Sequence, residues 1–104
     1  MEIVLLDIFV VPDESKSALL ETSRSIGDVL RSLPGFVEGF VYEKKTGDGR
    51  HNIVTTTVWE DESAFERARN AVPEKLRALG INPAERMKEL KVEIERGVYT
   101  RTPY

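Results

Sequence analysis

The first hydrophobic segment of the chain, residues 2–11, carries apolar side chains on both of its alternating faces. β-Branched and aromatic residues dominate it, Pro12 follows directly, and Asp7 interrupts its apolar interior. This pattern predicts a β-strand that is covered on both sides, because apolar faces are costly in water. We expect helices to cover one side and a second subunit to cover the other.

The next apolar residues recur at steps of three and four, which is the stripe of an amphipathic helix. This stripe consists of Leu19, Thr22, Ile26, Val29, Leu30 and Leu33. Acidic side chains at Asp13 and Glu14 favour the start of the helix, where the helix dipole is positive. Pro34 and Gly35 are predicted to end it.

Two further strands are predicted at residues 36–45 and 52–60, where apolar and polar positions alternate. Phe36, Phe40 and Tyr42 share one parity of the first of them. Between the two strands, glycines on either side of Asp48 allow positive φ, which favours a hairpin turn.

The last third of the chain predicts helices and a final strand. Residues 61–70 form a helical pattern, and Pro73 is expected to break or restart that helix. Residues 82–90 predict another short helical turn. Val92, Ile94 and Val98 then alternate in a last strand, which is followed by a polar tail.

The predicted order is therefore β-α-β-β-α-β, with no linker that would divide residues 1–104 into more than one domain. This order is typical of the α+β ferredoxin-like fold, an antiparallel four-stranded sheet with both helices on one face. The other face is expected to carry apolar residues such as Phe9, Phe40 and Val54. Since such a face is unfavourable in water, we expect a homodimer through the sheet.

Composition narrows the classes of function. The chain has 104 residues, 40% hydrophobic and 32% charged, with a net charge of -3 and no basic stripe, so nucleic-acid binding has little support. No apolar run is long enough to span a bilayer, and we expect a soluble cytoplasmic protein. Cysteine is absent and His51 is the single histidine, so disulfides, thiolate catalysis and Cys- or multi-His metal sites are excluded.

Two residues of the predicted strands are the first candidates for chemistry. Trp59, the only tryptophan, shares a strand face with Thr55 and Thr57. It either plugs the space between sheet and helix or forms the wall of a pocket that stacks on a planar ligand. Asp7 is either paired with an arginine or desolvated, and a desolvated carboxylate could act as a base near neutral pH.

The remaining candidates have ordinary structural alternatives. Arg69 on the second helix could stabilise an anionic substrate, or it could belong to a solvated helix face. Tyr42 and Tyr99 could donate hydrogen bonds to a phenolic substrate, or they could be core or interface residues. Thr57 and Phe65 would line the same site. His51 is expected to be an exposed turn residue.

Three stretches together resemble a known family: "VLLDIFVVPDES" (residues 4–15), "LRSLPGFVEGFVYE" (residues 30–43) and "VTTTVWEDESAFERAR" (residues 54–69). A helix that ends in Leu-x-Gly-Phe, a hairpin and a strand that ends in Val-Trp resemble the antibiotic biosynthesis monooxygenase (ABM) domain. That family belongs to the dimeric α+β barrel superfamily. The superfamily also includes isomerases, haem-binding proteins and members without known activity.

The resemblance implies two kinds of oxygen chemistry. Some relatives oxidise polycyclic phenols without metal or flavin, whereas others degrade haem held by a histidine of the second helix. The haem-ligand position falls near Arg69 or Asn70 and the first-strand asparagine position near Asp7, so haem degradation is disfavoured. Trp59 matches the tryptophan of the haem-degrading relatives.

The resulting hypothesis is a cofactor-independent monooxygenase of the ABM type that acts on a small aromatic or polyketide-like substrate. Asp7 would accept a proton, Trp59 would stack and Arg69 would stabilise negative charge, with no metal or other cofactor. The alternatives are a non-catalytic small-molecule-binding or stress-response dimer and an isomerase or lyase that uses the same cleft.

Overall fold

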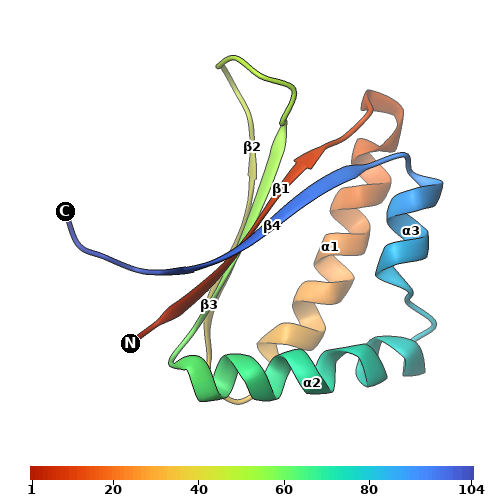
Figure 1. Cartoon of the computed structure of the whole chain (residues 1–104). Coiled ribbons are helices and arrows are strands. Elements are labelled where there is room, and N and C mark those ends of the chain that lie inside the picture. The colour runs from red at the N-terminus through yellow and green to blue at the C-terminus, as the bar shows by residue number, and fades with distance from the viewer.

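The computed structural model describes all 104 residues and has four strands in one antiparallel sheet of order β2-β3-β1-β4. Its elements are β1 (Ile3–Val10), a 3₁₀ turn (Asp13–Ser15), α1 (Lys16–Arg31), β2 (Phe36–Glu43), β3 (Ile53–Trp59), α2 (Glu62–Ala78), α3 (Pro83–Glu89) and β4 (Glu93–Thr100). The helices lie together on one side of the sheet (Figure 1). The predicted α+β ferredoxin-like fold is confirmed.

The second helix differs from the sequence prediction, because α2 continues through Pro73 to Ala78. Proline lacks an N–H, so the carbonyl of Arg69 loses its helical partner. Arg69 lies on an exposed part of the helix, where water can satisfy that carbonyl. Leu76, beyond the proline, is buried, and its packing holds the last turns in place.

Strand register divides the side chains of β1 between two environments. Ile3, Leu5, Asp7 and Phe9 face the helices, while the alternate residues face the uncovered side, here called the open face. Phe9 was expected on the open face but packs with Val11, Leu19 and Ile53 beneath the helices. The alternation itself does not say which set points inward.

The side of the sheet that faces the helices is packed at its two ends. One cluster joins Ile3, Trp59, Phe65 and Ala68, and the other joins Phe9, Val11, Leu19 and Ile53. The clusters share no residue, so the centre of this side of the sheet is not part of a continuous core. The space above that centre is the part of the fold that matters for function.

A glycine fixes the corner between α1 and β2. Gly35 has φ +85°, a left-handed conformation that side chains disfavour, and a Cβ atom there would lie 2.4 Å from the Cβ of Ala64. The Gly35 carbonyl also accepts a hydrogen bond of 2.9 Å from the Glu60 amide. These contacts bring the start of α2 against the corner, and they explain the Leu-x-Gly-Phe pattern.

We predict that Gly35→Ala lowers the free energy of unfolding by about 3 kcal/mol, since backbone strain and overpacking add. Gly80→Ala is the matched control, because Gly80 also has positive φ but has no atom within 4 Å of an added Cβ. Strain alone should cost about 1 kcal/mol there. Urea unfolding measures both, and equal losses would contradict the close approach at Gly35.

Candidate active site

Two rows of side chains cross the centre of the sheet on its helix-facing side. Leu5 pairs with Thr57 and Val98, and Asp7 pairs with Thr55 and Arg96. On β2, Gly39 and Val41 extend the two rows. Although they face the helices, Val41 is 41% exposed and Val98 is 54% exposed.

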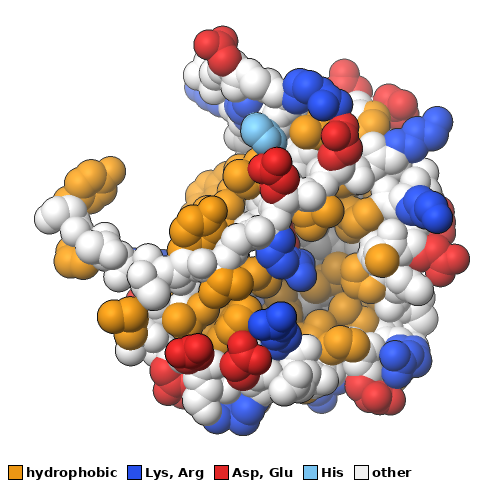
Figure 2. Space-filling view, in the orientation of Figure 1, with side chains coloured by type: hydrophobic (Ala, Val, Ile, Leu, Met, Phe, Trp, Pro, Cys, Tyr) orange, Lys and Arg blue, Asp and Glu red, His pale blue; other side chains and the backbone are white.

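This incomplete burial outlines a hollow between the two core clusters. Figure 2 shows the molecule hollowed between the sheet and the helices, with hydrophobic side chains along the walls and basic side chains near the opening. An apolar recess with a few polar groups is the common form of a small-molecule site. We call the space above the two rows the central hollow, and we take as its floor the residues that register places in these rows: Leu5, Asp7, Gly39, Val41, Thr55, Thr57, Arg96 and Val98.

Trp59 closes one end of the central hollow. It is 2% exposed, belongs to the cluster of Ile3 and Phe65, and meets the Phe36 ring edge-on at 5.4 Å and 82°. Its indole N–H donates to Thr57 Oγ1 at 3.2 Å. The indole is thus a packed plug, and its polar edge is directed towards the Thr57 hydroxyl at the border of the hollow.

Asp7 occupies the middle of the floor and is 7% exposed. Arg96 holds both of its carboxylate oxygens: Nε donates to Oδ1 at 2.8 Å and Nη2 donates to Oδ2 at 3.0 Å. This hydrogen bonding raises the pKa of the Arg96 guanidinium above its ordinary value, although burial acts in the opposite direction. Of the two alternatives for Asp7, the structure therefore shows pairing with an arginine, and that arginine is Arg96.

Arg96 was missed in the sequence analysis. It stands two residues after Ile94 and two before Val98, so its parity placed it on the same face as those apolar side chains. A charged residue inside an apolar alternation was the signal that could have found it. Its partner is 89 residues away in the chain, which no local pattern reveals.

Three predicted site residues lie elsewhere, and the expected grouping in one cleft is corrected for them. Tyr42 pairs with Val54, and Tyr99 pairs with Val4, so both tyrosines are on the open face. Arg69 is exposed on α2 and pairs with Glu66 at 3.3 Å. The structure brings together Asp7, Thr57, Trp59 and Phe65 on the helix-facing side.

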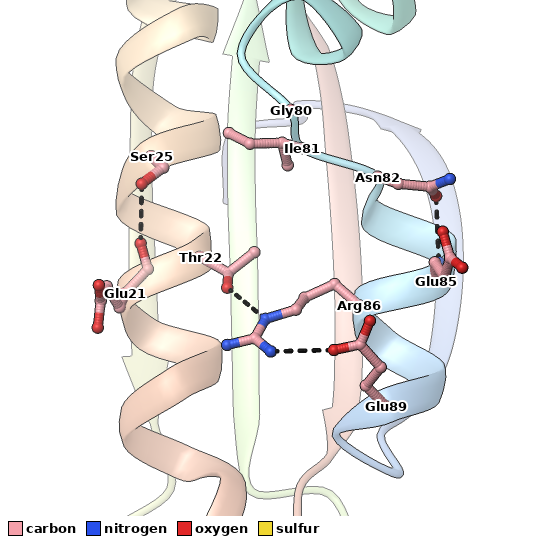
Figure 3. A pocket seen from close by; sticks show the side chains of 9 residues that line it. All are labelled: Glu21, Thr22, Ser25, Gly80, Ile81, Asn82, Glu85, Arg86 and Glu89. Carbon is pink, nitrogen blue, oxygen red and sulfur yellow. Dashed lines mark hydrogen bonds and ion pairs between the residues drawn. The ribbon is translucent and has the colours of Figure 1, made fainter.

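Two other cavities have different character. One, of about 280 Å³, lies between α1 and α3, and Figure 3 shows Arg86 in it, bound to Thr22 and Glu89. Ile81 is its one hydrophobic residue, so it is poorly suited to an apolar ligand. The other, of about 450 Å³, contains His51 and Arg50 near the end of β1.

Solved structures share this fold. SnoaB, a cofactor-independent oxygenase from Streptomyces nogalater, is 26% identical, with 99% of this chain and 95% of that chain covered and a TM-score of 0.63. A protein from Mycobacterium tuberculosis is 16% identical with a TM-score of 0.72, covering 100% of this chain and 98% of its own. No curated protein sequence matches this chain significantly.

The sequence comparison decides the family. The model described as "Antibiotic biosynthesis monooxygenase" matches residues 1–74. The chain belongs to the ABM family. The matched residues include Asp7, Thr57 and Trp59, whereas Arg96 lies beyond them.

Metal-ligand groups and membrane-spanning helices are also absent from this ABM protein. No group of three or more His, Asp or Glu side chains is arranged to hold a metal ion. None of the helices combines the length and the apolar character that crossing a membrane requires.

We predict that removing Arg96 destabilises the fold more than removing Asp7. Arg96→Ala should lower the free energy of unfolding by about 2–3 kcal/mol, because it leaves a buried carboxylate without a partner. Asp7→Ala should cost about 1 kcal/mol or less, since the Arg96 side chain is 61% exposed and can be hydrated. Urea unfolding at neutral pH measures both, and a larger loss for Asp7→Ala would refute the burial argument.

Proposed function

We propose that this ABM protein is a cofactor-independent monooxygenase that oxidises a small aromatic or polyketide-like substrate in the central hollow. The observation that carries the proposal is an apolar hollow beside Thr57 and Trp59 that also reaches the Asp7–Arg96 pair. Family membership and the likeness to SnoaB support the reaction class.

The walls suit the chemistry that such a reaction needs. A planar ring would lie over Leu5 and Val41, excluding water, with the edge of Trp59 at one end. The Thr57 hydroxyl accepts from the indole, which leaves its own proton free to donate to a substrate oxygen. In a reaction of this type, a ring CH₂ and one O₂ become a carbonyl and one water, and the substrate anion supplies the electrons.

We predict that the purified protein consumes O₂ with anthrones or hydroquinones when no metal or flavin is added. Trp59→Phe should keep an aromatic ring at this position but remove the donor that orients Thr57, and we expect kcat/KM to fall about tenfold. An oxygen electrode and product analysis provide the measurement. The wild-type melting temperature is the control for folding.

Other outcomes of the same assay favour the alternative functions. Substrate conversion without O₂ uptake would indicate an isomerase or lyase. An absence of turnover, together with a ligand-induced rise in melting temperature, would indicate a binding protein. The fold itself does not decide between these functions, because one fold supports many functions. A protein of the ethyl tert-butyl ether D family from Bacillus halodurans shares it with a TM-score of 0.66. The two proteins are 10% identical, and the match covers 98% of this chain and 100% of that chain.

We further propose that two copies associate through the open face. Phe40, Tyr42 and Tyr99 are each more than half exposed there, and Phe40 and Tyr42 are adjacent at 6.3 Å between ring centroids. The C-terminal end projects away from the helices (Figure 1), where it can reach a partner. Covering this apolar surface would be favourable.

We predict that Phe40→Asp converts the dimer to a monomer, because the interface would bury one carboxylate from each subunit. Phe40 is 53% exposed in the isolated chain, so the substitution should leave the fold of each subunit intact. Light scattering after size exclusion measures the mass. Leu79→Asp, at an exposed apolar residue beyond the sheet, is the control, and a monomeric wild type would disprove the proposal.

A further inference from the structure

Arg96 has donor capacity that the protein does not use. A guanidinium has five N–H donors, and two of them bind Asp7, which leaves three without a protein acceptor. The side chain is 61% exposed and stands on β4, the edge strand that borders the central hollow. Its free donors are therefore available to a ligand.

Asp7 makes this arginine rigid. Two parallel hydrogen bonds, at 2.8 Å and 3.0 Å, fix the plane of the guanidinium. Since the carboxylate is bound on one edge, the opposite edge remains positive and in a defined direction. Such an edge suits a planar anion such as a carboxylate or phenolate. The flexible ammonium of a lysine would not fix the anion's orientation in this way.

A second cation on the helix-facing side is already paired. Lys16 Nζ lies 2.7 Å from Oε1 of Glu43, which stands on the opposite edge strand, β2. Leu5 and Val98 adjoin the ion pair in the next row and provide an apolar surface for a ring. One end of the ligand would thus meet positive charge, and the other would meet hydrocarbon.

We propose that Arg96 selects ligands in which an anionic oxygen is attached to a planar aromatic ring, and that Asp7 positions Arg96 for this contact. This inference rests on the proposed function, because it assigns a substrate class to the same hollow. It assigns Asp7 the task of holding a cation, which differs from that of a proton acceptor.

The test compares naphthoate with naphthamide, a pair of nearly equal shape that differs in charge. Calorimetric titration of the wild type should show about tenfold tighter binding of naphthoate, since hydrogen bonds to a charged partner are the stronger ones. Arg96→Gln should abolish this preference while leaving naphthamide affinity within about twofold. Arg96→Lys should restore part of the preference, which a purely structural role would not produce.

Two further variants separate the explanations. Asp7→Asn should weaken naphthoate binding. In the oxygen-consumption assay, with a substrate that the protein oxidises, it should raise KM more than it lowers kcat. A loss confined to kcat would instead identify Asp7 as a base. Arg101→Gln is the control: Arg101 follows β4 and pairs with Glu2 and Glu38, and its loss should not change the preference. Melting temperatures verify that each variant is folded.

The outcomes distinguish this inference from the proposed function. Equal binding of the two probes by the wild type, or a preference that survives in Arg96→Gln, would overturn the selection by Arg96 but leave an apolar ligand site in place. No binding of either probe overturns the selection as well. Oxygen consumption is measured separately, so turnover of anthrones or hydroquinones with the same KM in Arg96→Gln as in the wild type would retain the monooxygenase and reject the anion contact.

Discussion

One constraint shapes the centre of the sheet: the Asp7 carboxylate is buried in the inner strand β1 and requires a partner. Asp7 stands where an apolar side chain would continue the core between Ile3 and Phe9, and a buried charge is costly unless it is paired. Arg96, on the adjacent strand, offsets that cost with two hydrogen bonds. The two apolar clusters lie on either side of this ion pair, and neither cluster includes it.

This division of the core gives the hollow its chemical character. One end has an indole and a threonine hydroxyl in contact at 3.2 Å, and the floor carries a cation that two hydrogen bonds to Asp7 hold in place. A bound ring would displace water from this floor and so strengthen electrostatic interactions there. A fold that many families share thus acquires a particular ligand preference from a few side chains on the helix-facing side of its sheet.

Hydrophobic spacing was sufficient to predict the strands, the first helix, the fold and the shared face of Thr57 and Trp59, because these depend on local periodicity. Tyr42 could not be placed, since a β-bulge between Phe36 and Glu38 shifts the alternation, and Phe36 faces the helices whereas Tyr42 faces away. The pairing of Asp7 with Arg96 joins the two ends of the chain. Such contacts are set by the topology of the sheet, which only the folded chain defines.

The central claim is that the centre of this sheet is open on its helix-facing side. Methyl NMR spectra of the protein under xenon pressure test it directly, because xenon enters apolar spaces without requiring a specific ligand. We expect the largest shifts at Leu5, Val41 and Val98, and small shifts at the packed Leu19 and Ile53. Shifts confined to residues of the open face, such as Val54, or no selective shifts at all, would contradict it.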